Sequence, residues 1–172
     1  MYRGSSFLLQ KDYKVHIPVV KELLKAKYKP LVGIACEDLK DTRNQKLMKD
    51  INVYLVEYYD VIQKSVKEQE VKKQLSDTLI TKILMGTLGC VPDYDRYFIA
   101  GIKAQGVATG NYNINSILKL VDFYEKNADR LEPVRKGMLI YDLLYPQMKM
   151  LDMGFWQIGF ELDTQKGLKV SH

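Results

Sequence analysis

The sequence predicts a mainly α protein, a single-domain orthogonal bundle of six or seven helices. Apolar residues recur at steps of three and four rather than in alternation, which is the helical period. Capping residues, glycines and prolines divide these periodic runs at short intervals. At 172 residues, of which 47% are hydrophobic and 27% charged, the chain is long enough for one core. We therefore assign residues 1–172 to one helical domain.

The N-terminal part of the chain has the weakest pattern. Residues 1–16 favour either a short strand or an extended arm. A helix begins near Pro18, because the missing amide hydrogen of proline has no partner in a first helical turn, and it stops before Pro30. The following stretch, LVGIACEDL, is compatible with a short strand or with another helical turn.

The strongest periodicity covers residues 43–68. The short side chain of Asp41 or Thr42 is suited to cap its first turn. One stripe on this helix collects the apolar positions, so it should face the core. The stripe comprises Leu47, Ile51, Tyr54, Leu55, Tyr58, Ile62 and Val66.

A helix–turn–helix corner follows in the stretch KILMGTLGCVPDYDRYFIAGIKAQG. The preceding helix opens at Ser76 and Asp77, and Gly89 ends it in the left-handed conformation that glycine favours. We expect the next helix over residues 93–105, with Asp93 as its cap and Asp95 in its first turn.

The C-terminal third divides at prolines. After a polar loop, Asn113 or Asn115 caps the run SILKLVDFYEKNADRL, which Pro133 closes. The stretch GMLIYDLLYPQMKMLDMGFWQIGFELD predicts one helix kinked at Pro146 or two abutting helices. Residues 164–172 lack an apolar face, and we expect this tail to fray.

The composition argues against several classes of site. The histidines, His16 and His172, have no metal-ligand or triad spacing, and the cysteines, Cys36 and Cys90, have the character of small buried apolar residues. We expect no metal and no cofactor. No secretory signal or membrane span is apparent, and a reducing cytoplasm is the simplest location. Tyr54, Tyr58 and Tyr59, with Phe155 and Trp156, are expected in the core.

The charge permits a polyanionic partner. The formal net charge is +5 and the isoelectric point is about 9.0. Lys21, Lys25 and Lys29 cluster on the first predicted helix, where they either form a solvated face or follow a phosphate backbone. We therefore list nucleic acid among the expected partners.

The stretch TKILMGTLGCVPDYDRYF resembles the core of the helix-hairpin-helix DNA glycosylase superfamily. In that family, an aspartate at the start of the second helix faces a flipped nucleotide and assists cleavage of the base–sugar bond. The resemblance implies that Asp95 is the matching acid and Asp93 the second. Lys82, Arg96 and Lys103 would then flank this corner as phosphate contacts.

These patterns favour a binding protein over an enzyme. The first hypothesis is a helical protein that binds nucleic acid or another protein. The second is a glycosylase-like enzyme that uses Asp95 on a nucleotide or DNA base. The third is a structural homo-oligomer held together by the apolar C-terminal helix LLYPQMKMLDMGFWQIGF, since a helix that is hydrophobic nearly all round must be covered.

Overall fold

The computed structural model confirms the mainly α helical bundle, and within the residues that it describes, 13–65, 75–139 and 141–170, it contains no strand. The expected arm falls largely on residues 1–12, outside the described part. The elements are η1 (Tyr13–His16), α2 (Ile17–Leu23), η2 (Ala26–Leu31), η3 (Glu37–Lys40), α3 (Thr42–Ser65), α4 (Asp77–Thr87), α5 (Arg96–Ala104), α6 (Ile114–Lys126), α7 (Ala128–Gly137) and α8 (Gln147–Val170). The η elements are short 3₁₀ helices.

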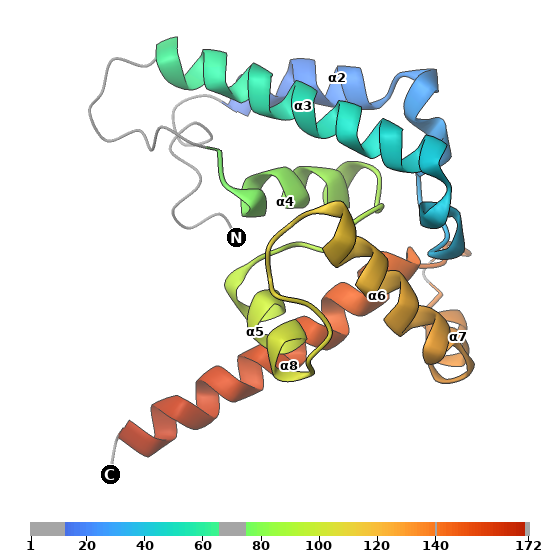
Figure 1. The fold of residues 1–172 in the computed structure, drawn as a ribbon, viewed down its shortest axis with the longest axis vertical. Helices are drawn as coiled ribbons and strands as arrows, with labels where there is room; N and C mark the ends of the chain where they lie inside the picture. The colour runs from blue at the N-terminus through green and yellow to red at the C-terminus, as the bar shows by residue number, and fades with distance from the viewer. Residues whose placement is uncertain (1–12, 66–74, 140, 171–172) are drawn as a thin grey trace.

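The helices form two groups that α4 separates. In Figure 1, α2 and α3 lie together on one side of α4, and α5, α6, α7 and α8 lie on the other. The long α8 crosses this second group, and α5 packs directly on it. The corner between α4 and α5 therefore lies beside α8.

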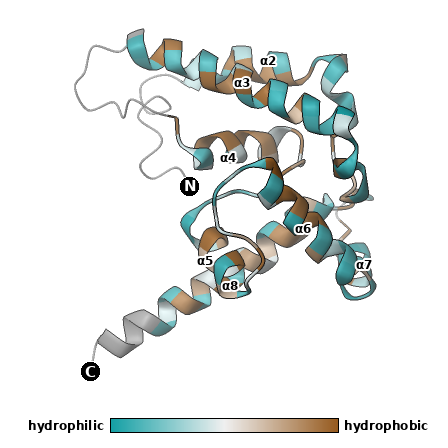
Figure 2. Ribbon diagram, viewed as in Figure 1, coloured by the Kyte–Doolittle hydropathy of each residue, from teal (hydrophilic) through white to brown (hydrophobic). Residues whose placement is uncertain are grey.

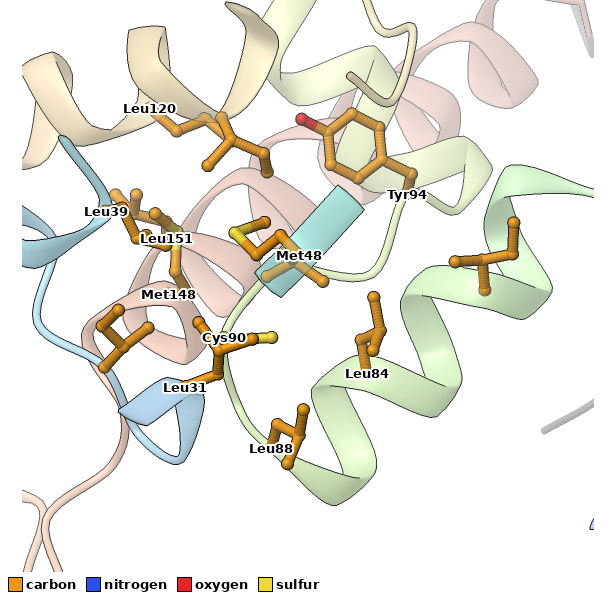
Figure 3. Packing of buried hydrophobic residues seen from close by; sticks show 14 of the residues in the cluster. Leu31, Leu39, Met48, Leu84, Leu88, Cys90, Tyr94, Leu120, Met148 and Leu151 are labelled. Carbon is orange, nitrogen blue, oxygen red and sulfur yellow. The ribbon is translucent and has the colours of Figure 1, made fainter. Parts of the chain in front are cut away.

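One continuous core joins both groups. Figure 3 shows its centre, where α4 contributes Leu84, α3 contributes Met48, α6 contributes Leu120 and α8 contributes Met148 and Leu151. The apolar residues of α4 are prominent in Figure 2, whereas α7 is largely hydrophilic. The core thus holds α4 in the middle of the fold.

Two glycines bring α5 and α8 into backbone contact. A Cβ added at Gly101 on α5 would overlap the carbonyl oxygen of Phe155, and a Cβ added at Gly159 on α8 would overlap the carbonyl oxygen of Tyr97. Any larger residue would therefore push the helices apart. This contact fixes the start of α5 against the middle of α8.

A polar cluster around Glu132 fastens α7 to the start of α8. Its carboxylate accepts hydrogen bonds from the Arg135 guanidinium, from Tyr124 Oη at 2.7 Å and from Gln147 Nε2 at 2.7 Å. Gln147 Oε1 in turn accepts from the backbone amide of Cys36 at 2.6 Å. These bonds, the arginine first among them, lower the pKa of Glu132 to about 2.

The N-terminal predictions need correction. Residues 13–16 form a 3₁₀ turn rather than an arm or strand, and the helix from Ile17 ends at Leu23. Lys25 then adopts an extended backbone, which interrupts the helix, and Pro30 lies inside the 3₁₀ helix η2. The ambiguous stretch LVGIACEDL is irregular up to the 3₁₀ turn η3. The prediction for residues 43–68 is close, since α3 begins at Thr42 and runs to Ser65; residues 66–68 lie outside the described part.

Two C-terminal predictions are wrong. Asn113 caps α6 as expected, but the chain breaks at Asn127 and Pro133 lies inside α7 instead of ending a helix. No helix precedes Pro146 over 138–139 and 141–145, because Tyr141 and Asp142 have positive φ angles of 48° and 63°. The helix α8 continues through Val170, and the fraying expected of residues 164–172 stays a prediction; residues 171–172 lie outside the described part.

Candidate functional site

The corner between α4 and α5 is built by two caps and a left-handed glycine. Ser76 caps α4, and Gly89, with φ of 65°, ends it by donating its amide to Leu84 O at 3.0 Å. The cap of α5 is Asp95, whose Oδ1 accepts from the backbone amides of Tyr97 and Phe98, both at 2.9 Å. The prediction that Asp93 caps this helix is therefore wrong: the helix starts at Arg96, three residues later.

A pocket of about 590 Å³ opens beside this corner. Its walls come from α4, from the turn before α5 and from the middle of α8. The lining residues are Lys82, Met85, Gly86, Asp93, Asp95, Lys149, Asp152, Met153, Trp156 and Gln157. Asp93, Asp95 and Lys82, expected near one another from the sequence, are therefore brought together.

Asp95 makes hydrogen bonds both within α5 and to the pocket wall. While Oδ1 caps α5, Oδ2 accepts a hydrogen bond from Trp156 Nε1 at 3.1 Å. Its carboxylate therefore receives three hydrogen bonds, two from backbone amides and one from the indole. This bonding holds the side chain in place and ties the start of α5 to α8.

Asp93 has a very different environment. Its side chain is 18% exposed, its Oδ1 is buried without a hydrogen-bond partner, and its Oδ2 lies 3.6 Å from Lys82 Nζ. Burial raises the pKa of Asp93 to about 6, and the nearby charges of Asp95 and Asp152 also raise it while Lys82 lowers it. A carboxyl group with this pKa exchanges its proton near neutral pH.

Asp152 supports Asp93 from α8. Its Oδ1 accepts the backbone amide of Asp93 at 2.9 Å, and its Oδ2 pairs with Lys149 Nζ at 2.6 Å. Three carboxylates and two ammonium groups thus line the pocket. With every group ionised its net charge is −1, and protonation of Asp93 brings it to zero. The described residues contain no group of histidines, cysteines and acids that could hold a metal ion.

The apolar wall is formed by Trp156, Met85 and Met153. Trp156 stacks on Phe160 with ring centroids 5.2 Å apart and meets Tyr97 edge-on. We expected Trp156 in the core, but it is half-buried in the pocket wall. It is the only tryptophan in the sequence, so its fluorescence reports on this pocket.

The other predicted basic contacts are dispersed. Arg96 is exposed and lies against Tyr97 and 3.5 Å from Asp163, and Lys103 lies exposed in the last turn of α5. Lys25 pairs with Glu22. Figure 1 shows α2 on the far side of α4 from α5. The lysines in and after α2, at positions 21, 25 and 29, are therefore not brought together with the pocket.

The sequence reasoning missed the α8 side of the site. Asp152, Lys149 and Trp156 lie within one stretch, MKMLDMGFW, at helical spacings of three and four. An acid inside such an apolar run was the available signal, since a charged residue buried in a helix needs a partner. Only the fold shows that this partner is the backbone of Asp93.

No family model, curated protein or solved structure matches the chain. Among the helices of the described residues, none has the length and apolar character that a membrane crossing requires.

Proposed function

We propose that the pocket between α4, α5 and α8 binds a small amino-substituted heterocycle, the chemical class that includes adenine, guanine and cytosine. Its volume of about 590 Å³ lies within the usual range for small-molecule sites. The indole of Trp156 and the thioethers of Met85 and Met153 offer an apolar wall suited to a flat ring.

The observation that carries this proposal is the state of Asp93. Its Oδ1 is buried without a hydrogen-bond partner among the described residues, although the side chain lines the pocket and its Oδ2 pairs with Lys82. A buried acceptor without a donor is unfavourable, and the N–H groups of an amino-heterocycle would supply donors. The three carboxylates in the pocket also favour a ligand ring that carries N–H donors.

The test is a fluorescence titration of Trp156 with free adenine, guanine, cytosine and uracil. We expect the three amino-substituted bases to change the emission at lower concentration than uracil, which lacks the exocyclic amine. Asp93→Asn should weaken adenine binding at least about tenfold, because the amide replaces a charged acceptor. Binding of adenine should also strengthen as the pH rises through about 6, where Asp93 loses its proton.

Asp163→Asn is the matched control, because Asp163 pairs with Arg96 outside the pocket and is 56% exposed. It should bind adenine as the unmodified chain does. Equal affinities of the Asp93→Asn variant and the unmodified chain would refute the proposal. So would a Trp156 signal that does not respond to any of the bases.

Hydrolysis of a base–sugar bond is the second candidate function, and the pKa of Asp93 near 6 favours it. Protonated Asp93 would donate its proton to the leaving base as the bond between base and sugar carbon breaks. Water would add to that carbon, and its released proton would return to Asp93. Asp95, with three hydrogen bonds, would position Trp156 and the corner.

Incubation with nucleosides and with single-stranded DNA, followed by chromatography of released base, tests this reaction. Asp93→Asn should abolish release, while Asp95→Asn should reduce it, since asparagine still caps a helix. Full release by Asp93→Asn would remove the assignment. The role of Asp95 itself as the catalytic acid stays a prediction that the same pair of variants tests.

Nucleic acid as a macromolecular partner also stays a prediction, supported by the net charge of +5. Binding to a DNA oligonucleotide should weaken steeply as salt is raised, because phosphate contacts release counterions. The absence of binding at low salt would leave a small ligand or a protein as the partner.

A further inference from the structure

A second pocket, of about 320 Å³, lies between α4 and the elements η1, α2 and α3. Its walls come from η1, α2, α3 and α4. It is lined by Tyr13, His16, Val19, Val20, Tyr59, Leu79, Lys82, Ile83, Gly86 and Thr87. Two of these residues, Lys82 and Gly86, also line the first pocket. The two pockets therefore meet across one turn of α4.

Gly86 has no side chain on the turn of α4 that lies between the pockets. It is exposed in the last turns of α4, and a Cβ added there would meet no atom within 4 Å. Packing therefore does not require glycine here, in contrast to Gly101 and Gly159, where a Cβ would strike backbone. Glycine inside a helix lowers its stability relative to alanine. Gly86 therefore leaves open space on the turn of α4 that lines both pockets.

The second pocket has the chemistry of a site for an uncharged ring. Its lining is aromatic and aliphatic apart from His16, Lys82 and Thr87. His16 Nδ1 shares a hydrogen bond with Tyr59 Oη, its Nε2 is buried without a partner, and burial lowers its pKa, so the imidazole is neutral at pH 7. A hydrogen-bonding atom on the bound ring would supply the partner that Nε2 lacks.

Lys82 occupies the boundary. Its ammonium group, 3.6 Å from Asp93 Oδ2, lines both pockets and carries donors suited to an anionic or strongly accepting group. Along this surface, the carboxylate of Asp93 and the indole of Trp156 are thus followed by the ammonium group of Lys82 beside Gly86. The aromatic second pocket comes next.

We propose that the two pockets form one bipartite site for a ligand with a ring at each end and an anionic linker, which crosses α4 over Gly86 beside Lys82. A dinucleoside monophosphate is the simplest compound of this class. One amino-substituted base would lie against Trp156 and Asp93, the phosphate beside Lys82, and the second base in the His16 pocket. This inference rests on the proposed function, because it places the first base where that proposal does.

The experiment compares adenosine with the dinucleotide ApA by Trp156 fluorescence. The unmodified chain should bind ApA at least about tenfold more tightly than adenosine, because a stacked second base adds this much. Gly86→Leu should remove the advantage of ApA over adenosine, and because Gly86 lines both pockets, the affinity of this variant for adenosine is the reference for its affinity for ApA. Gly154→Leu is the matched control, since Gly154 is an exposed mid-helix glycine with open space around it and lines neither pocket.

A second pair of variants guards against an indirect effect of leucine. Val20→Glu places a negative charge at the edge of the His16 pocket and should weaken ApA but not adenosine. Val56→Glu, at a comparably exposed valine of α3 outside both pockets, should change neither. Thermal unfolding of all four variants should show cooperative transitions, which confirms that they fold.

The outcomes separate this inference from the proposed function. Adenosine binding that depends on Asp93, combined with equal affinities for ApA and adenosine, overturns the bipartite site and leaves the first pocket intact. An ApA advantage that survives both Gly86→Leu and Val20→Glu also overturns it. If neither adenosine nor ApA changes the Trp156 emission, the proposed function fails and the bipartite site fails with it.

Discussion

Glu132 and Asp93 are two largely buried acids beside α8. Their surroundings shift the pKa of the carboxyl group in opposite directions. Their side chains are similarly exposed, at 23% and 18%. Glu132 accepts hydrogen bonds from Arg135, Tyr124 and Gln147, and its pKa falls to about 2. Asp93 Oδ1 has no hydrogen-bond partner among the described residues, Asp93 Oδ2 pairs with Lys82, and the pKa of Asp93 rises to about 6. Burial is the main cause of the raised pKa of Asp93, whereas at Glu132 the hydrogen bonds, that of Arg135 first, outweigh the effect of burial.

The difference distinguishes a structural acid from a candidate functional one. The Glu132 carboxylate accepts hydrogen bonds from three side chains of the fold. The pocket around Asp93 leaves a carboxylate with unmet hydrogen-bonding capacity at a cavity wall, an arrangement that is typical of binding and catalytic sites. The comparison yields four predictions.

Replacement of Glu132 should have the largest effect. A pKa lowered from 4.5 to about 2 corresponds to about 3 kcal/mol of stabilisation, at ~1.4 kcal/mol per pKa unit. We expect Glu132→Ala to lower the free energy of unfolding by about 2–4 kcal/mol in denaturant titrations, since it also leaves buried donors unpaired. Glu161→Ala, at an exposed acid that accepts a hydrogen bond from Gln157, should cost less than about 0.5 kcal/mol. If Glu132→Ala lowered the free energy of unfolding as little as Glu161→Ala does, the structural role of Glu132 would be contradicted.

Asp93→Asn should change the free energy of unfolding in the opposite direction. The ionised carboxylate at pH 7 is destabilising, because its pKa in the fold is about 6 rather than 3.8. The neutral amide removes this penalty, and we expect a gain of about 1–3 kcal/mol in the free energy of unfolding at pH 7. A gain in stability together with loss of adenine binding would be the signature of a residue kept for function. A loss of stability would instead make Asp93 a second structural acid.

The two acids should also divide the pH profile of stability. As the pH falls from 7 through about 6, the folded chain protonates Asp93 before the unfolded chain does, so the free energy of unfolding should rise. Below about 4.5 the unfolded chain protonates Glu132 first, and the contribution of Glu132 should be lost progressively towards pH 2. Denaturant titrations from pH 3 to 8 measure both parts. The Asp93→Asn variant should lack the rise, and its persistence there would assign it to another group.

Asp95→Ala should have the smallest effect of the four, a loss of about 1 kcal/mol, as is typical for an N-cap. Asp95→Asn should restore most of that stability because asparagine is an equally good cap. Circular dichroism during thermal unfolding measures both. An Asp95→Ala variant as stable as the unmodified chain would show that the bond to Trp156 and the cap contribute nothing.

The sequence predicts the local parts of this site well. Ser76, Gly89 and Asn113 act at the helix ends where short side chains and a left-handed glycine are needed, and each of these signals depends only on neighbouring residues. The mainly α bundle follows from the same periodicities. Asp95 rather than Asp93 caps α5, because either spacing from Pro92 satisfies a cap rule and only tertiary contacts select between them.

The rest depends on contacts between distant parts of the chain. Trp156 reaches Asp95 across 61 positions and Asp152 reaches Asp93 across 59, and no local pattern encodes these pairs. Helical periodicity also fails as a guide before α8, where Tyr141 and Asp142 adopt positive φ angles. Contacts between distant residues thus determine the pocket, while the local sequence determines where the helices begin and end.

The glycines of the α5–α8 crossing bear on mutational tolerance. Gly101 and Gly159 touch no ligand, yet every other amino acid would begin with the same Cβ and strike the same carbonyl. In a library of single substitutions selected only for folding, these two positions should remain glycine, whereas Gly86, Gly137 and Gly154 should accept many replacements. Selection for ligand binding should then restrict Gly86 alone among those three. The pattern of permitted substitutions would thereby separate glycines that the backbone requires from one that a ligand requires.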